Sequence, residues 1–450
     1  MSLAPRSSTI LDAARSEVLS ARALSRRPIV LDVTHLVTRL SRRATTGIDR
    51  VDLAYARYLV GRDPPVAAAT HYGLFRPHVL SAARMRSLIE HFERQQLEEE
   101  CGERSEWQSL RARFSGQNPP LRTIAASSQP YSWARLFAVQ SGFRVLHKLG
   151  ASIPRNSIYL NIAQHAFEHH RFFSWLRRRP DVVPVFLAHD LLPLDVPEFF
   201  PPGYERRFGR RVETMVRWAR AVITTSAQVA QRIETEYRDR RLAPVPIHVE
   251  PLASPLEQSG EINQRKAGFL NGVSYFVAIS TIEPRKNHSL LIQIWRALMR
   301  RGIATPKLVI VGKRGWESEQ TFRELDLAPD LRQHVIEVSS LPSAHLRSLL
   351  KNARALLMPS FAEGYGLPIV EALSLETPVI CSDIPVFLEV SQGKALLIPP
   401  LDGLSWLRAI ELLTPEDSVL RTQLQARTLE FKPPTWGSYF QNVEAFLGNL

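Results

Sequence analysis

The sequence has little cysteine and no long hydrophobic run, and both absences exclude classes of protein. Cys101 and Cys381 are the only cysteines in 450 residues. Two cysteines are too few for a disulfide framework or a cysteine metal cluster. No apolar run reaches the roughly 18 to 20 residues that a membrane-spanning helix needs. The sequence therefore predicts a cytoplasmic protein that is not integral to a membrane.

Motifs that bind metals or nucleic acids are also missing. The sequence has no D-x-D element, no zinc-finger spacing, no RNA-recognition signature and no basic zipper. His165 and His169 share a helix face at four-residue spacing, and His170 follows, but the glutamate of H-E-x-x-H is absent. We therefore expect no metal, no cofactor and no nucleic-acid partner.

Acidic residues are outnumbered, and the excess of positive charge calls for an anionic partner. The chain has 57 Lys and Arg against 44 Asp and Glu, a net charge of +13. A phosphorylated ligand or an anionic membrane surface would meet this charge, since each Lys or Arg near phospholipid headgroups contributes about 1 kcal/mol. The alternative is that the arginines are solvated on helix faces. They cluster before residue 250, at Arg42, Arg43, Arg177, Arg178, Arg179, Arg206, Arg207, Arg210, Arg211, Arg238, Arg240 and Arg241.

Alternating strand and helix patterns predict two α/β halves joined near 251–266. Such alternation indicates parallel sheets covered by helices on both faces, with ligands at the carboxyl ends of the strands. We predict strands at 28–33, 157–163, 182–188, 221–226 and 245–250 in the first half, and within SYFVAIS, KLVIVG, HVIEV, RALLMP and TPVICS in the second. Residues 1–27 lack the apolar core of a secretory signal and form an N-terminal extension. A helix-prone insertion near 74–151 has no assignable chemistry; acceptor specificity, membrane contact or packing are its predicted roles.

The most informative segment is PSFAEGYGLPIVEALSLETPVI, residues 359–380. It follows a predicted buried strand at 354–359, and it predicts a turn containing Gly364 and Gly366 and a helix from Leu367 with proline near its start. Glycines allow close approach of a ligand to the backbone, and the helix N-terminus favours a phosphate. Glu363 and Glu371 flank this turn, where their carboxylates can accept hydrogen bonds from sugar hydroxyls.

Three segments of the second half resemble retaining glycosyltransferases of family 4, which have the GT-B fold. EGYGLPIVE, with seven residues between Glu363 and Glu371, resembles the E-x7-E element of that family. AISTIEPRKN, residues 278–287, and LVIVGKRGW, residues 308–316, resemble the corresponding turns of its mannosyltransferase-like members. The resemblance implies two Rossmann-like domains facing each other across a cleft: residues 28–255 on the acceptor side, 266–432 on the nucleotide-sugar side, and a helix within 433–450 that crosses back.

Two weaker segments of the first half agree with the same family. TGIDRV, residues 46–51, resembles the glycine-containing loop that faces the donor phosphates, which implicates Gly47 and, on the acceptor side, Arg50. FLAHDLLPLDVPE, residues 186–198, places His189 and Asp190 directly after a predicted strand and resembles the family turn near the transferred sugar. The alternatives are a simple helix start and a turn that caps the strand.

The resemblance implies transfer of a hexose from a nucleotide sugar to an acceptor, with retention at the anomeric carbon. The implied acceptor is a saccharide or a lipid-linked saccharide. Arg285 and Lys286 would stabilise the departing diphosphate, Glu363 and His189 would contact the sugar, and Asp190 the acceptor. The donor contacts implied are Glu283, Gly364, Tyr365, Gly366, Leu367 and Glu371.

The predicted donor is GDP-mannose, with UDP-glucose or dTDP-rhamnose as alternatives and the base near 337–341. We also keep two other functions open: a non-catalytic nucleotide-sugar-binding protein and a nucleic-acid-binding protein. The expected location is peripheral, on the inner face of the plasma membrane. Glu376 stands where glycine is usual after the helix, and Ser339 and Ser340 replace a Gly-Tyr pair, so these positions depart from the family pattern.

Overall fold

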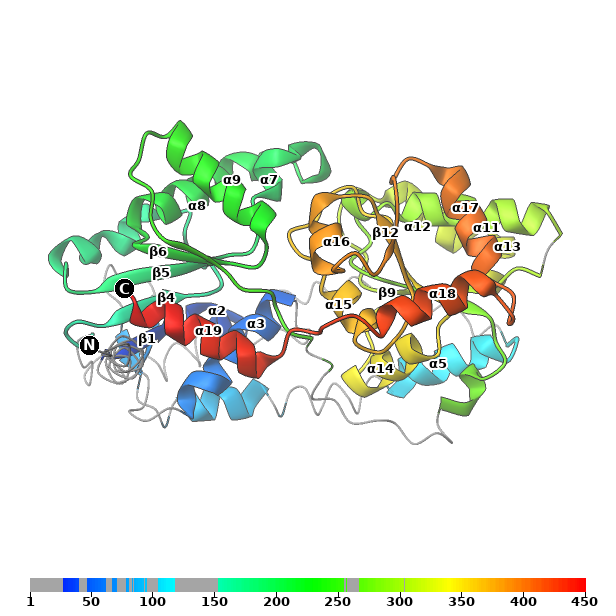
Figure 1. Ribbon diagram of the computed structural model, residues 1–450, viewed down its shortest axis with the longest axis horizontal. Helices are drawn as coiled ribbons and strands as arrows, with labels where there is room; N and C mark the ends of the chain where they lie inside the picture. Colours follow the sequence, from blue (N-terminus) through cyan, green and yellow to red (C-terminus); the bar gives the residue numbers. More distant parts are fainter. Residues whose placement is uncertain are drawn as a thin grey trace, which may run out of the picture.

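The chain folds into two α/β halves that lie side by side (Figure 1). The computed structural model describes residues 27–39, 47–61, 67–70, 78–80, 83, 85–92, 94, 104–117, 153–254, 256, 267–302 and 304–450. Nearly all of the expected N-terminal extension, Arg42, Arg43, Cys101 and much of the 74–151 insertion lie outside these residues.

The first half contains a seven-stranded sheet in the order β3-β2-β1-β4-β5-β6-β7. All neighbouring strands are parallel except β2 and β3, which are antiparallel. Central strands such as VPVFLA of β5 are nearly continuous apolar runs because helices cover both faces. The strands are β1 (Ile29–Asp32), β2 (Ala67–Thr70), β3 (His78–Leu80), β4 (Ile158–Asn161), β5 (Val183–Ala188), β6 (Ala221–Thr224) and β7 (Ile247–Val249).

Helices pack on the two faces of this sheet in separate cores. One core includes side chains of α2 (Thr34–Arg39) and α3 (Gly47–Val60), and the other includes those of η2 (His170–Arg178), α8 (Tyr204–Trp218) and α9 (Ala227–Asp239). Ser226 caps α9 by accepting a hydrogen bond from Val229 N at 3.3 Å. Short elements α7 (Leu192–Asp195) and η3 (Pro197–Phe199) follow β5 at the carboxyl edge of the sheet.

The second half contains a six-stranded, fully parallel sheet in the order β10-β9-β8-β11-β12-β13. Chain order reverses between β8 and β11, so the turns after these two strands lie at a topological switch point, where open α/β sheets bind ligands. The strands are β8 (Tyr275–Ile279), β9 (Lys307–Val311), β10 (Val335–Val338), β11 (Leu356–Met358), β12 (Val379–Ser382) and β13 (Leu396–Ile398).

Helices also cover both faces of the second sheet. One core contains side chains of α11 (His288–Arg300), α12 (Glu319–Leu327), α13 (Pro329–His334), α17 (Gly403–Leu413) and α18 (Val419–Thr428). The other contains side chains of α14 (Ser343–Lys351), α15 (Leu367–Leu373) and α16 (Pro385–Val390). Two 3-10 turns complete this half, η4 (Gly268–Leu270) and η5 (Pro284–Lys286).

Two helices cross between the halves. The C-terminal helix α19 (Trp436–Gly448) returns to the first half, where Tyr439 and Tyr55 of α3 share a hydrogen bond of 2.8 Å between their hydroxyls (Figure 1). In the opposite direction, α5 (Arg104–Phe114) leaves the first half and packs on the second. Its buried Trp107 contacts Phe269 and the ring of His345. The sequence analysis placed this helix with the first half, so its docking on the second is a new finding.

Candidate active site

The most strongly charged group of side chains lies where β8 and β11 end. Pro284 fixes the η5 turn after β8, which presents Arg285 and Lys286. Glu363 follows β11, and its carboxylate contacts both cations: Oε2 lies 2.7 Å from Arg285 Nη1, and Oε1 lies 2.5 Å from Lys286 Nζ. Residues widely separated in the sequence therefore meet at the switch point of the second sheet.

The charges of this cluster compensate one another away from water. Burial alone would raise the pKa of Glu363, but Lys286 and Arg285 overcome that effect and hold the pKa at about 2. Glu283 is also buried and pairs with Arg285 Nη2 at 2.7 Å. Burial raises the pKa of Glu283 and lowers that of Lys286. Two carboxylates and two cations thus form a compact, nearly neutral network.

The turn before α15, which contains Gly364 and Gly366, leaves less room for side chains than the sequence suggested. A Cβ on Gly364 would lie 2.6 Å from Asp190 Cβ and 2.8 Å from His189 O, so any side chain there would collide with the first half. Gly366 has a φ of +117° and begins α15, a backbone conformation that favours glycine. Gly364 is therefore required by the close approach of the two halves, while Gly366 shapes the helix N-terminus.

Two other predicted donor residues of this turn differ in their surroundings. The side chain of Tyr365 is buried and donates a hydrogen bond of 2.9 Å to Leu252 O in the segment that joins the halves. The Tyr365 hydroxyl therefore holds the joining segment in place. Any contact of Tyr365 with the donor is then made by its backbone. Leu367 lies across from Gly47, with 3.9 Å between Leu367 Cδ1 and a Cβ built on that glycine.

Glu371 occupies the inner part of the same helix but has far fewer partners than Glu363. Its side chain is buried, and burial raises its pKa. Arg50 Nη1 lies 3.9 Å from its Oε1, across the boundary between the halves. Gly47 and Arg50, predicted from a weak pattern, both lie on the first turn of α3 facing α15. The structure thus brings the N-termini of these two helices together.

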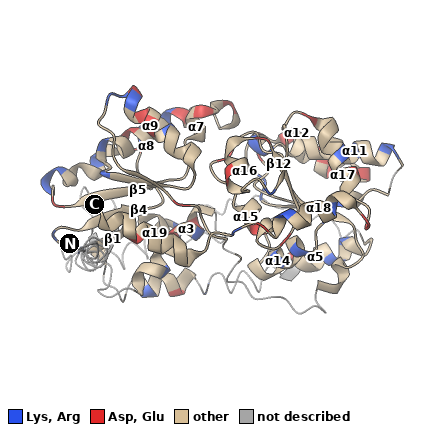
Figure 2. Ribbon diagram, viewed as in Figure 1, with Lys and Arg blue, Asp and Glu red and all other residues tan. Residues whose placement is uncertain are grey.

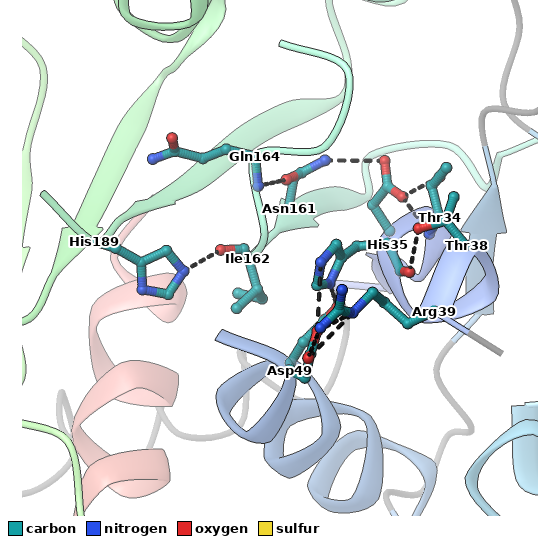
Figure 3. Close-up of polar contacts among 11 residues, drawn as sticks. Thr34, His35, Thr38, Arg39, Asp49, Asn161, Ile162, Gln164 and His189 are labelled. Atoms are coloured by element: carbon teal, nitrogen blue, oxygen red, sulfur yellow. Dashed lines mark hydrogen bonds and ion pairs between the residues drawn. The ribbon is translucent and has the colours of Figure 1, made fainter. Parts of the chain in front are cut away.

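His189 and Asp190 form the opposing wall at the end of β5. His189 Nε2 lies 2.9 Å from Ile162 O, so Nε2 carries the proton and donates to this carbonyl (Figure 3). Burial lowers the pKa of His189 to about 4, which leaves Nδ1 as a hydrogen-bond acceptor at neutral pH. Asp190 accepts a hydrogen bond of 3.1 Å from Leu192 N, and burial raises its pKa.

A polar network beneath α3 was not found from the sequence. Asp32, the last residue of β1, accepts hydrogen bonds from Thr34 N at 2.8 Å, from Asn161 Nδ2 at 3.0 Å and from the hydroxyl of Tyr159. Nearby, His35 Nδ1 lies 3.2 Å from Asp52 on α3. Asp32 thus joins the ends of β1 and β4, and the contact of His35 with Asp52 joins α2 to α3. An aspartate that closes an apolar strand, as in IVLD, is the signal that could have indicated it.

Aromatic and backbone contacts join the two walls outside the charged cluster. Phe199 stacks on Phe361 with 5.3 Å between ring centroids, and Trp316 Nε1 donates to Phe199 O at 3.0 Å. Ser226 Oγ donates to Gly364 O at 3.3 Å. The sequence analysis quoted Trp316 within a longer segment without giving it a role, and it did not mention Phe199. Both hold the segment after β5 against the second half.

The segment predicted to hold the base adjoins the helix that crosses from the first half. Ser339 Oγ lies 3.2 Å from Glu106 Oε1 of α5. Glu337 instead pairs with Arg314, at 2.7 Å between Oε2 and Nη2. In the described part of the chain, no three His, Cys, Asp or Glu side chains come together as ligands for a metal ion. The same residues include no helix long and apolar enough to cross a membrane.

Comparison with known proteins finds that the second half is similar to a recognised family. Residues 260–427 match the family model described as Glycosyl transferases group 1. The chain is 30% identical over 221 residues to the serotype-specific mannosyltransferase WbdA of Escherichia coli, a match that covers 47% of this chain and 27% of that protein. It is 29% identical over 228 residues to the O-antigen chain mannosyltransferase RfbU of Salmonella typhimurium, covering 50% of this chain and 59% of that protein. The chain thus spans between a quarter and three fifths of these relatives.

Solved structures identify the fold over most of the chain. HepE of Anabaena, solved in complex with UDP, superposes with a TM-score of 0.56 at 14% identity and covers 94% of this chain and all of that one. TarM superposes with a TM-score of 0.51 at 16% identity, covering 68% of this chain and 57% of that one. The predicted fold is confirmed: the molecule is α/β with two Rossmann-like halves in the GT-B arrangement. The residues that match the Glycosyl transferases group 1 model lie almost entirely in its second half.

Proposed function

We propose that this protein is a retaining, nucleotide-sugar-dependent hexosyltransferase that moves mannose from GDP-mannose to a saccharide acceptor in the synthesis of a bacterial surface polysaccharide or glycolipid. The observation that carries the proposal is the meeting of Arg285, Lys286 and Glu363 at the N-terminus of α15, opposite His189 and Asp190. The names of the relatives, a serotype-specific mannosyltransferase and an O-antigen chain mannosyltransferase, support mannose as the transferred sugar and a surface polysaccharide as the product.

The paired cations are suited to a departing diphosphate. Arg285 can grip phosphate oxygens through two N–H groups, and Lys286 adds a compact charge. Both are largely buried, where low dielectric strengthens their action on developing negative charge. The amides of Gly366 and Leu367 at the start of α15 add a second anion-binding element. Because these groups neutralise the diphosphate, we propose that the reaction needs no metal ion.

Glu363 has a double role in this proposal. Without donor, its carboxylate satisfies Arg285 and Lys286. A bound diphosphate competes for the same cations, so the carboxylate is released toward the sugar hydroxyls. His189 accepts a hydrogen bond from the sugar at Nδ1, and Glu371 binds the ribose of the nucleotide. Retention then follows from attack on the same face that the diphosphate leaves.

The location proposed is peripheral on the cytoplasmic side of the plasma membrane, with a lipid-linked saccharide as acceptor. Basic residues lie along α8 (Figure 2), and they support an anionic surface as partner. Arg206 and Arg210 of this helix are exposed. Part of this charge is already compensated, since Arg207 and Arg211 both pair with Glu168.

A thermal unfolding screen with GDP, UDP, dTDP and their sugar conjugates tests the donor. A ligand at 100 times its dissociation constant adds about 2.7 kcal/mol to the free energy of unfolding. We expect GDP and GDP-mannose to raise the melting temperature most, also in the presence of EDTA. A stronger response to UDP or dTDP would show that the donor carries that nucleotide and not GDP. No response to any nucleotide would refute the function.

Glu363→Gln provides the matched variant for the same screen. Because it removes the charge that occupies Arg285 and Lys286 but keeps the shape of the side chain, it should bind GDP at least as tightly as the wild type. Transfer of the sugar should nevertheless fall by about 100-fold or more. Loss of GDP binding together with transfer would contradict the division of roles between the cations and this carboxylate.

A further inference from the structure

A cavity of about 270 Å³ lies beside the charged cluster, between the two halves. Glu363 and Gly364 line it from the second half, and α7 and α9 line it from the first. Its volume is just below the roughly 300 to 1,000 Å³ of pockets for drug-sized molecules, so it suits one small ring. The residues from the first half are Asp190, Leu191, Leu192, Asp195, Gln228, Val229, Gln231, Arg232 and Thr235.

One stripe of α9 supplies most of the polar lining. Gln228, Gln231, Arg232 and Thr235 are spaced by three or four residues, so they share one face of the helix. The opposite side packs on the sheet through buried residues such as Ile233. The lining face is therefore free of the demands of the core, and it brings two glutamine amides and the Arg232 guanidinium to the cavity. The Thr235 hydroxyl donates to Gln231 O at 2.9 Å, so it can only accept a hydrogen bond from a ligand.

Arg232 has a hydrogen-bonding group that the protein leaves unused. Its Nε donates to Asp195 Oδ1 at 2.5 Å, and its Nη2 pairs with Glu236 Oε1 at 2.8 Å. Its Nη1 is buried and has no partner among the described residues. A buried N–H group without a hydrogen-bond partner makes the folded protein less stable, and a ligand oxygen that accepts from it removes this cost. The two paired carboxylates also hold the guanidinium in place.

We propose that this cavity binds the acceptor, and that its occupant is the uncharged terminal sugar whose hydroxyl is glycosylated; this rests on the proposed function. Glutamine amides both donate and accept hydrogen bonds, and the threonine hydroxyl accepts them, as an array of sugar hydroxyls requires. The carboxylates of Asp190 and Asp195 repel a phosphate, so any phosphorylated carrier lies outside the cavity.

The position of the cavity matches the reaction. Glu363 lines it and also holds the cations assigned to the leaving group, so the acceptor hydroxyl is adjacent to the donor sugar. The hydroxyl oxygen forms a bond to the anomeric carbon, the bond from that carbon to the diphosphate oxygen breaks, and the hydroxyl proton passes to the diphosphate. Arg50, the other acceptor residue suggested by the sequence, pairs with Glu371 and does not line the cavity.

The test measures binding of small neutral glycosides to the full chain with GDP bound. The probes are the methyl glycosides of mannose, glucose and N-acetylglucosamine, observed by saturation-transfer NMR and titration. Gln231→Trp fills the cavity from an exposed helix position, and Glu234→Trp introduces the same side chain on α9 outside the lining. We expect at least one probe to bind the wild type and Glu234→Trp equally, and to bind Gln231→Trp at least tenfold more weakly.

Binding of GDP separates failure of this proposal from failure of the proposed function. All three proteins should bind GDP equally, because the stripe on α9 does not touch Arg285 or Lys286. If GDP binds but no glycoside does, or if Gln231→Trp binds the glycoside as well as the wild type, the acceptor site is wrong and the function stands. If GDP does not bind the wild type, the proposed function fails and this inference fails with it. A methyl mannoside 6-phosphate that binds as well as the neutral mannoside would also overturn the assignment.

Discussion

The two walls of the interdomain site are organised on opposite principles. On the second half, opposite charges pair directly: Arg285 and Lys286 contact Glu363 at 2.5 to 2.7 Å, while Arg285 Nε is buried without a partner among the described residues. On the first half, the polar groups are neutral or incompletely paired: the pKa of His189 is lowered to about 4 by burial, and Arg232 has a buried N–H group without a partner among the described residues. The charged wall is suited to an anionic donor and the neutral wall to a polyol acceptor.

Removing one cation should disturb the charged wall most. Lys286→Met keeps the apolar stem but removes the ammonium that contacts Glu363 at 2.5 Å. We expect the rate of transfer to fall by about 100- to 1,000-fold, because the leaving diphosphate loses a buried counter-charge. The free energy of unfolding should fall by about 1 to 3 kcal/mol, since Arg285 still pairs with the carboxylate. Steady-state kinetics and urea unfolding measure the two effects.

Lys394→Met is the matched control for this substitution. Lys394 also contacts a carboxylate at 2.5 Å, but its partner Glu430 is largely exposed. We expect neither transfer nor the unfolding midpoint to change, because exposed ion pairs contribute little. If the two variants behaved alike, burial would not distinguish the site pair from a surface pair, and the comparison of the walls would fail.

The contribution of His189 on the neutral wall to the free energy of unfolding should rise with pH. A histidine held charged in a salt bridge would show the opposite dependence. In the unfolded chain His189 takes up a proton near pH 6.5, whereas in the folded protein its pKa is about 4. The stabilisation is therefore complete above pH 6.5 and declines as the pH falls toward 4. His288, whose pKa burial lowers to about 3, acts in the same direction, while Glu363 loses its contribution only between its usual pKa of 4.5 and about 2.

His189→Gln tests this dependence. Urea unfolding at pH 7.5, 6.5, 5.5 and 4.5 should show a smaller loss of stability in the variant than in the wild type, by about 1 to 3 kcal/mol over the range. His170→Gln, at an exposed position, should keep the slope of the wild type. A slope unchanged in His189→Gln would show that this histidine is not held neutral.

Local pattern predicted most of the strands, and the family resemblance indicated the residues of the charged wall. Runs such as VVPVFLA and KLVIVG became β5 and β9 because buried parallel strands are nearly continuous apolar segments. The E-x7-E element and the EPRKN turn indicated the position of the site because they follow the predicted strands that became β11 and β8. Glu376, which replaces the usual glycine, still adopts a φ of +59°, so the expected left-handed backbone after α15 is present.

What escaped the sequence depends on contacts between distant segments. The strands β2, β3 and β13 are only three or four residues long, and the AAAT of β2 has little of the β-branched and aromatic content that marks a strand. The docking of α5 depends on Trp107 meeting Phe269 and His345, pairs that no periodicity relates. The polar stripe on α9 is recognisable as a helix face, but its partner Gly364 lies 136 residues beyond Gln228.

The smallest effect expected concerns Glu371, which shares a helix with the charged wall but not its pairing. Its carboxylate is buried, its pKa is raised by burial, and its contact with Arg50 is 3.9 Å long. Glu371→Gln preserves shape and hydrogen-bonding capacity, so the unfolding free energy should change by less than about 1 kcal/mol. If the residue binds the ribose, the KM for the nucleotide sugar should rise about tenfold while kcat stays within about threefold, because the interaction is equal in ground and transition states. A fall in kcat as large as that of Glu363→Gln would mean that Glu371 also contributes to the transfer step and does not only bind the nucleotide.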